Sequence, residues 1–159
     1  MKFCPECGSK LSSKVIDGAS RVICENSDCG FVHWNNPTPV VAALVKFNDK
    51  YIIAQNALWP KGVFSGITGY LEQGETPEHA VVREVKEELN LEGKIHRFLG
   101  HFDFKEKNQL IIAYEIHATG QLQINHELAE IKQLSAKELL EYDFHPLYIT
   151  EGIIKVWGK

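Results

Sequence analysis

Apolar residues are grouped along the chain in runs that predict strands. The segment 40–47, VVAALVKF, is almost continuously apolar, as expected of a strand that is buried on both faces. Residues 48–50, NDK, indicate a turn, and 51–55, YIIAQ, then predicts the partner strand of a hairpin. Two later apolar segments, 94–104 and 109–120, are joined by the charged sequence KEKN and predict a second pair of strands.

Capping residues mark the predicted helices. Thr76 is a good N-cap and is followed by a proline, which suits the first helical position, so a helix is predicted from there to about residue 90. Ser135 is the expected N-cap of a short helix over 136–142, and the apolar tail 145–159 predicts a closing helix. Because strands and helices are mixed rather than strictly alternating, we expect an α+β fold arranged as an α/β/α sandwich.

The composition is that of an ordinary soluble domain. The chain has 159 residues, of which 44% are apolar and 24% charged. Acidic residues outnumber basic ones by 21 to 17, and the net charge of −4 gives no general attraction to nucleic acids or anionic membranes. No apolar run approaches the ~20 residues of a membrane span, and the start MKFCPECGSK is unlike a signal peptide. We therefore expect a cytoplasmic enzyme or binding protein with no membrane partner.

Four cysteines at the start of the chain predict a metal site. Cys4 and Cys7 form a C-x2-C pair, and Cys24 and Cys29 form a C-x4-C pair after 16 intervening residues. Two close pairs separated by a hairpin-length segment are typical of a structural zinc ribbon with four thiolate ligands. The alternative of two disulfides is disfavoured in a reducing compartment. The wider second spacing leaves open that His33 replaces Cys29 as a ligand.

The cysteine-containing segment has few apolar side chains, so the metal is expected to be its core. The sequence NNPTP, residues 35–39, contains two prolines and reads as the linker that leaves it. We therefore divide the chain into a zinc ribbon, 1–35, and a second domain, 36–159. No regular element is assigned within that domain to the glycine-rich stretch 59–69 or to 121–134.

Three glutamates share one face of the predicted long helix. Glu84, Glu87 and Glu88 have i, i+3 and i+4 spacing, so they lie within about 100° of arc. They sit near the negative end of the helix, where each carboxylate is unfavourable. A solvated acidic surface is the simple alternative. The glycine-rich stretch before the helix favours a ligand site instead, because convergent carboxylate and carbonyl oxygens suit Mg²⁺ or Mn²⁺.

The same region resembles the signature of the Nudix hydrolases, G-x5-E-x7-R-E-U-x-E-E-x-G-U, in which U is aliphatic. Matching positions are Gly69, Glu75, Arg83, Glu84, Val85, Glu87, Glu88 and Leu91. The one departure is Asn90, where the pattern has glycine; asparagine is the next best residue for a left-handed helix end. Flanking strands extend the likeness over about 40–142. The resemblance implies a Nudix-type α/β/α sandwich with a mixed sheet, preceded here by the small zinc ribbon.

The resemblance also implies roles for individual residues. Glu84, Glu87 and Glu88 would hold catalytic Mg²⁺ or Mn²⁺, with the backbone carbonyl of Thr68 as a further ligand. Arg83 would orient a glutamate by ion pairing, and Glu75 would support the junction between loop and helix.

Family members often use a later glutamate as a base or ligand. Glu127 is our first candidate, Glu130 the second, and Glu72 a weaker one; a solvated surface charge is the alternative for each. Among the aromatic residues, Trp59 and Phe64 are predicted to stack on the substrate. Phe102 and Phe104 could also stack on an adenine or flavin, and burial in the core is the alternative for all four aromatic residues.

A ribbon followed by a Nudix domain is similar to two groups, the NADH pyrophosphatases and compact zinc-ribbon Nudix proteins. The proline- and tryptophan-rich tract SQPWPFP that is diagnostic of the first group is absent, and RFLGHFDFKEKNQL occupies its region. The layout implies hydrolysis of a dinucleotide-type pyrophosphate such as NADH, FAD or ADP-ribose.

Two other activities are weighed against that reading. One is a pyrophosphohydrolase of nucleoside triphosphates or dinucleoside polyphosphates. The other is a ligand-sensing, nucleic-acid-binding protein, which the intact glutamates and the acidic net charge disfavour. Nucleic acid is not expected as a partner, capped RNA excepted, and the sequence leaves a homodimer open.

Overall fold

The computed structural model describes residues 1–159 and divides them into two compact units, Met1–Pro37 and Thr38–Lys159. The first unit is a small antiparallel sheet with the strand order β1-β2-β3. Its strands are β1 (Leu11–Ile16), β2 (Ala19–Cys24) and β3 (Val32–His33). The β1–β2 hairpin fills most of the interval between the two cysteine pairs, as the spacing of the cysteines predicted.

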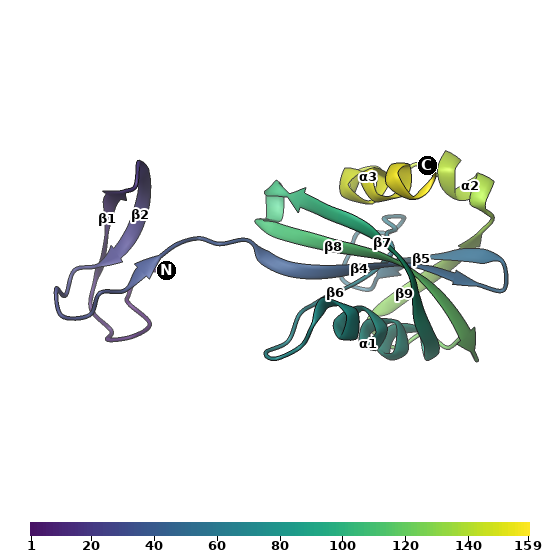
Figure 1. The fold of residues 1–159 in the computed structure, drawn as a ribbon, viewed down its shortest axis with the longest axis horizontal. Coiled ribbons are helices and arrows are strands. Elements are labelled where there is room, and N and C mark those ends of the chain that lie inside the picture. Colours follow the sequence, from purple (N-terminus) through teal and green to yellow (C-terminus); the bar gives the residue numbers. More distant parts are fainter. The chain divides into compact units, whose positions relative to one another are not determined.

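A mixed sheet forms the centre of the second unit (Figure 1). Its strands are β4 (Thr38–Phe47), β5 (Lys50–Asn56), β6 (Ile67–Tyr70), β7 (Leu91–Phe104), β8 (Gln109–Gly120) and β9 (Leu128–Leu134). The order is β7-β8-β4-β5-β9, with β6 also paired to β4. The β4–β8 pair is parallel and the other pairs are antiparallel.

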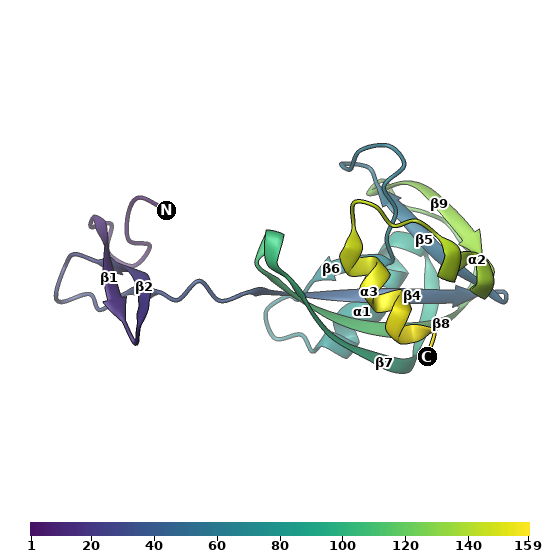
Figure 2. The same ribbon diagram turned by 90° about the horizontal axis from the view of Figure 1, so that it is seen from above.

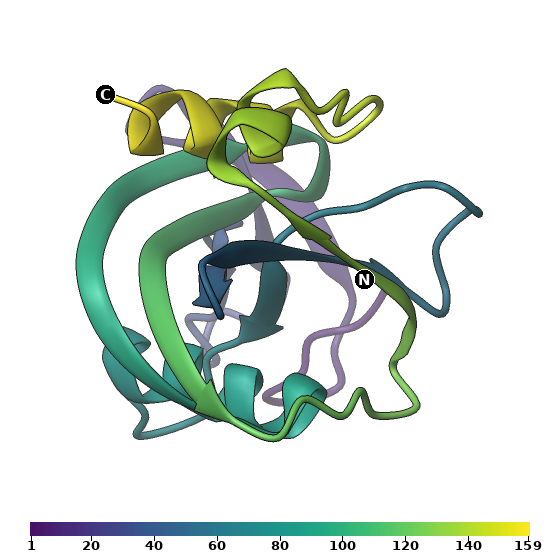
Figure 3. The same ribbon diagram turned by 90° about the vertical axis from the view of Figure 1, so that its right-hand side faces the viewer.

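Helices cover both faces of this sheet. Figures 1 and 3 show α1 (Pro77–Leu89) on one face, and α2 (Ala136–Glu141) and α3 (Tyr148–Trp157) on the other. Seen from above in Figure 2, α3 lies across the central strands. The predicted α/β/α sandwich with a mixed sheet is therefore confirmed. None of these helices combines the length and the apolar composition needed to traverse a lipid bilayer.

Strand β4 divides the core because its side chains alternate between the two faces. Its odd-numbered residues pack with Val81, Val85 and Leu89 of α1. Its even-numbered residues pack with Ile153 and Ile154 of α3. Between Val40 and Val45 both sets are buried, which explains why this part of the strand reads as a continuous apolar run, whereas Thr38 and Pro39 are exposed.

One edge of β4 is shared by two partner strands. Residues 40–43 pair with β6, whereas 45–47 pair with β5. Strand β5 does not pair with β6, and an isolated bridge joins Ala54 of β5 to Ser65, just before β6. The sheet therefore opens between these two strands, and Gly66 lets the incoming chain lie close to β4: a Cβ atom at this position would be 2.6 Å from the carbonyl oxygen of Ala43.

The predicted turn and cap residues have the expected conformations. Asn48 and Asp49 both have positive φ, 48° and 61°, as the two-residue turn of a hairpin requires. The Thr76 hydroxyl accepts a hydrogen bond from the backbone N–H of His79 at 3.3 Å and begins α1. Asn90 adopts the left-handed conformation with φ 58° and ends α1. Ser135 begins α2 as predicted, within a complete capping box.

Three elements differ from the sequence prediction. The end of the stretch read as irregular is strand β6, and the segment left unassigned contains β9. Strand β7 begins at Leu91, three residues before the predicted start. Strands β6 and β9 are stabilised by pairing with β4 and β5, which lie earlier in the chain, and local composition does not report such pairing. The additional residues of β7 pair with the end of β8, where Leu91 lies opposite Gly120.

Candidate functional site

Arg83 links the loop before α1 to the glutamates in the second half of the helix. All five N–H groups of its guanidinium are used. Nε and Nη2 donate to the two carboxylate oxygens of Glu75 at 2.9 and 3.0 Å. Nη1 donates to Glu84 at 2.8 Å and to Glu87 at 2.9 Å, and Nη2 also donates to the carbonyl oxygen of Tyr70 at 3.1 Å. One side chain thus ties β6, and the loop between β6 and α1, to the glutamate-bearing face of α1.

Gly69 lies against the carboxylate of Glu84. A Cβ atom at position 69 would be 1.9 Å from both Cδ and Oε1 of Glu84. Because Gly69 has no side chain, the Glu84 carboxylate can lie directly against strand β6. The pKa of Glu84 is raised by burial, although the charge of Arg83 acts in the opposite direction.

Glu88 is a buried carboxyl group. Only 5% of the residue is exposed. Burial raises the pKa of Glu88 to about 8, and the neighbouring charges of Glu84, Glu127 and Glu87 add to the shift. An acidic group in such a place is stabilised as a carboxylate when a cation lies beside it. The electrostatics of this position therefore favour cation binding.

The α1 carboxylates do not converge on one point as positioned. Glu84 and Glu87 both lie on Arg83. The structure contains two groups of three or more ligand side chains whose ligand atoms all lie within 4.8 Å of one another, and neither includes these residues. Mutual repulsion separates carboxylates that share no cation. Binding one divalent cation jointly would require their side chains to rotate.

These glutamates line a pocket of about 660 Å³. Its walls also include residues from β4, β6, the 57–66 loop and the β7–β8 turn. Glu127, the first candidate for a later glutamate, lines this pocket, as do Glu72 and Thr68. Glu130 does not line it and is exposed on β9. The structure thus brings Glu127 to the α1 carboxylates and leaves Glu130 outside.

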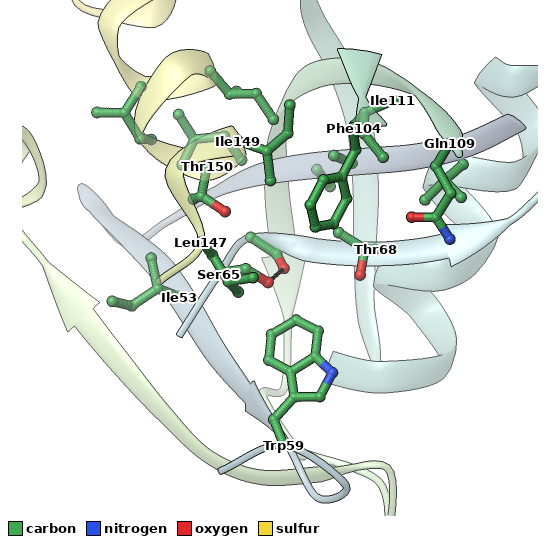
Figure 4. A pocket seen from close by; sticks show the side chains of 17 residues that line it. Ile53, Trp59, Ser65, Thr68, Phe104, Gln109, Ile111, Leu147, Ile149 and Thr150 are labelled. Atoms are coloured by element: carbon green, nitrogen blue, oxygen red, sulfur yellow. Dashed lines mark hydrogen bonds between the residues drawn. The ribbon is translucent and has the colours of Figure 1, made fainter. Parts of the chain in front are cut away.

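A second, apolar pocket of about 100 Å³ continues from the first under α3. The two pockets share Val40, Trp59, Thr68, Phe104, Gln109 and Leu147. Figure 4 shows the Trp59 indole on one side of this pocket and Phe104 with the isoleucines of α3 and β8 on the other. A charged compartment and a ring-sized apolar compartment are therefore contiguous.

Phe64 does not belong to either pocket, so the expectation that it stacks on a substrate is wrong for this structure. The residue is only 3% exposed. Its ring packs against Tyr142 with 6.3 Å between centroids, and the ammonium of Lys132 lies 4.2 Å from its centroid. Phe64 is therefore a residue of the hydrophobic core, whereas Trp59 lines both pockets.

The four cysteines converge in the first unit. The Sγ atoms of Cys4 and Cys29 are 3.6 Å apart and those of Cys7 and Cys24 are 3.5 Å apart, and all four lie within 4.8 Å of one another. Four sulfurs placed tetrahedrally at the ~2.3 Å Zn–S distance would be about 3.8 Å apart, so the set fits zinc. His33 is not part of this group.

The wider second cysteine spacing is accommodated by a local turn. The side-chain oxygen of Asn26 accepts a hydrogen bond from the backbone N–H of Asp28 at 3.1 Å. The backbone carbonyl oxygen of Asn26 accepts one from the backbone N–H of Cys29, also at 3.1 Å. Gly8 and Gly30, which follow the two pairs, have positive φ of 72° and 68°, as expected from their place in tight turns.

His96, Glu115 and His117 form the other convergent group. Burial would raise the pKa of Glu115, but hydrogen bonds from neighbouring side chains and the charge of Arg97 lower it overall. Arg97 also donates to the carbonyl oxygen of Trp157 at 2.8 Å. A metal ion in this group would be repelled by Arg97, which already pairs with Glu115. We therefore assign the group a structural role, in which it holds the end of α3 on the sheet.

Comparison with known families identifies the fold and its relatives. The NUDIX domain model matches residues 36–150, which is most of the chain. The chain belongs to the Nudix family. A second model, described as Nudix N-terminal, matches residues 2–35.

Curated relatives of this Nudix chain include nucleotide hydrolases. It is 30% identical over 114 residues to the NAD-capped RNA hydrolase NudC of Vibrio atlanticus, covering 72% of this chain and 41% of that protein. It is 27% identical over 133 residues to the human mitochondrial NAD(P)H pyrophosphatase NUDT13, covering 82% and 37%. This chain therefore spans about half or less of the length of the relatives it matches.

Solved Nudix structures share the fold. A NUDIX hydrolase from Nitrosomonas europaea superimposes with a TM-score of 0.82 at 22% identity, covering 97% of this chain and 89% of that one. A UDP-X diphosphatase superimposes with a TM-score of 0.63 at 21% identity, covering 78% and 62%.

Sequence reasoning missed Lys107 and Gln109 as part of the Nudix pocket. They line it together with Phe104, which the sequence had offered as a stacking candidate, and all three lie in or beside the predicted KEKN turn. The turn itself was predicted, but its approach to α1 depends on the β4–β8 pairing. The one signal in the sequence was the length of the two strands, which can carry the turn between them to a distant part of the domain.

Replacing Gly69 by alanine should inactivate the Nudix site without unfolding it. The new Cβ would displace the Glu84 carboxylate, and a displacement of about 1 Å can cost ~100-fold in rate. We expect a loss of kcat of about that size, measured in a steady-state hydrolysis assay. Gly152→Ala is the control, because its Cβ would meet nothing closer than 3.9 Å. Full activity in Gly69→Ala would show that the position of Glu84 is unimportant.

Proposed function

We propose that this protein hydrolyses the pyrophosphate of a nucleoside diphosphate linked to another group, with NADH, FAD and ADP-ribose as the leading substrates. The observation that supports it best is the continuity of the two pockets. A carboxylate-lined compartment suited to divalent cations and phosphates opens into an apolar one. A substrate with a pyrophosphate attached to a flat ring has this distribution of polar and apolar groups.

The acidic residues fit the divalent cations that Nudix enzymes use. Glu84, Glu87 and Glu88 supply hard oxygen ligands, and Thr68 lies beside them on β6 to add its carbonyl oxygen. Magnesium and manganese are both proposed, since carboxylate donors suit either ion. When bound, such ions neutralise phosphate charge and lower the pKa of a water molecule.

Protein side chains position and deprotonate the attacking water in this proposal. Arg83 donates hydrogen bonds to Glu84 and Glu87 and is proposed to orient a glutamate by ion pairing when cations bind. Glu127 faces the same pocket and is proposed to accept a proton from the water. Glu84 is the alternative acceptor, because burial raises its pKa towards the range in which a carboxylate takes up a proton.

The apolar compartment is proposed to bind a base or flavin ring. Trp59 and Phe104 offer aromatic surfaces, and Gln109 and Thr150 offer polar groups at the same pocket. Aromatic stacking of this kind gives affinity for any planar ring. The named activities of the NudC and NUDT13 relatives on NAD-containing molecules support a dinucleotide substrate. NAD-capped RNA is included in the proposal on the same basis.

The first unit is proposed to be a separate structural zinc domain, with residues 1–35 as the ribbon and 36–159 as the hydrolase. Cys4, Cys7, Cys24 and Cys29 are its proposed ligands. Its role in this proposal is confined to folding, because the residues that line the two pockets all belong to the second unit.

A substrate panel tests the proposed activity. We expect Mg²⁺- or Mn²⁺-dependent cleavage of at least one of NADH, FAD and ADP-ribose between the two phosphates, with release of a mononucleotide detected by chromatography. Addition of excess EDTA should abolish it. The apolar pocket predicts a higher kcat/KM for the best of these substrates than for any nucleoside triphosphate, which has no second ring or sugar to bind. A higher kcat/KM for triphosphates would reject the substrate assignment, and no hydrolysis of any member would reject the activity.

A further inference from the structure

The β7–β8 turn brings one lysine to the carboxylate-lined pocket. Lys107 ends the 3-10 turn Lys105–Lys107, and Asn108 follows it in the left-handed conformation with φ 51°. Phe104 and Gln109, on either side of this turn, also line the pocket. The Gln109 side chain donates to the Tyr70 hydroxyl at 3.1 Å. Both ends of the turn therefore lie at the pocket, in a part of its wall that comes from β7 and β8 and not from α1.

Lys107 is the basic residue of the pocket whose charged group has no ion-pair partner in the protein and can bind a ligand. The lining contains Arg83 and Lys107 as its basic residues, against five glutamates. Arg83 is saturated, because each of its N–H groups already donates to a protein oxygen. No carboxylate lies within ion-pairing distance of Lys107, and its side chain is exposed. By contrast, Lys105 in the same turn lies 3.9 Å from Asp103 and does not line the pocket.

We propose that Lys107 is a phosphate-binding residue that holds the substrate phosphate farther from the α1 carboxylates. This inference deepens the proposed pyrophosphatase function and rests on it. A pyrophosphate has two phosphorus centres. Cations held by the glutamates would neutralise the phosphate that lies beside α1. The other phosphate needs a positive group from a different wall. An ammonium is a compact point charge that suits this role without demanding a fixed approach angle.

The proposal predicts a specific kinetic effect. Lys107 binds the same phosphate before and during the reaction, so its loss weakens binding uniformly. Lys107→Gln should raise KM about 10-fold with little change in kcat, since one charge-assisted hydrogen bond is worth about that factor. The kcat/KM of the wild-type protein should fall with added salt more steeply than that of Lys107→Gln. Lys107→Arg should restore most of the affinity.

The matched control is Lys105→Gln, which removes the same charge from the same turn but away from the pocket. The assay uses the full chain with Mg²⁺, the best substrate of the panel, and low and high NaCl. Thermal unfolding of each variant checks folding. Equal KM values for Lys107→Gln and the wild type would overturn the proposal, as would an equal rise in KM for Lys105→Gln, because that would be a general charge effect.

A binding measurement separates this inference from the proposed activity. The affinity of ADP in the presence of Mg²⁺ is measured by calorimetry for the wild type and both glutamine variants. We expect about 10-fold weaker binding in Lys107→Gln alone. If the wild type hydrolyses no substrate but this difference is found, the proposed activity fails while phosphate binding by Lys107 stands. If hydrolysis is found and the ADP affinities are equal, the role of Lys107 is rejected and the activity stands.

Discussion

The Glu87→Gln, Glu88→Gln double variant should lose hydrolysis by more than about 100-fold, because even residues that only orient a metal ligand are worth ~10–100-fold. Each amide removes an anionic oxygen from the face of α1 that we propose to bind divalent cations. The fold should persist. Glu88 is buried, and burial raises its pKa, so the uncharged and nearly isosteric glutamine is tolerated at this position.

The measurement combines kinetics with thermal unfolding. Mg²⁺ should raise the Tm of the wild-type protein, since a ligand that binds only the folded state stabilises it, and should not raise that of the double variant. Glu92→Gln is a suitable control, because Glu92 is exposed and pairs with Lys86 at 2.8 Å away from the pocket. Near-wild-type turnover in the double variant would refute the metal assignment.

Replacing Cys24 by serine should release zinc and unfold the first unit while the second unit remains folded. The buried apolar residues of Met1–Pro37 are Cys4 and Cys24 themselves. The unit therefore has almost no hydrophobic core, and structural zinc contributes on the order of 10–16 kcal/mol to small domains of this kind. Elemental analysis should give one zinc per chain for the wild type and much less for the variant.

Amide NMR spectra or limited proteolysis would locate the unfolding within residues 1–37. His33→Ala is the informative control, because His33 lies outside the cysteine group and the variant should keep its zinc. Retention of zinc in Cys24→Ser together with its loss in His33→Ala would reverse the ligand assignment. Stoichiometric disulfides without zinc, after purification under reducing conditions, would refute the ribbon.

Features set by neighbouring residues were predictable from the sequence. The start of α1 at Thr76 and its end at Asn90 depend on hydrogen bonds within one turn, which the residue types reveal. The face shared by Glu84 and Glu88 follows from helix periodicity. The Sγ convergence of the cysteines follows from their spacing and the intervening hairpin.

Features set by distant contacts were not predictable in the same way. Strand β6 forms only because four residues pair with β4, and a glycine inside it weakens the local signal. The two aromatic candidates, Trp59 and Phe64, are five residues apart, yet one lies at the pocket and the other is in the core. Which way a loop side chain points depends on the packing partner, here Tyr142, which lies far along the chain.

The alternation of β4 has a consequence for how such a protein can change its specificity. Odd-numbered residues of this strand support the helix that carries the glutamates, whereas Val40, Ala42 and Leu44 line the apolar pocket. Most of the apolar pocket lining from β4 and the packing against α1 thus lie on opposite faces of the strand, although Ala43 also lines the apolar pocket and Val40 also lines the carboxylate-lined one. Substitutions at Ala42 and Leu44, with matching changes in α3, can reshape the apolar pocket while the packing of β4 against α1 is kept. For the proposed pyrophosphatase, a change of substrate preference would therefore need only a few substitutions on one face of β4.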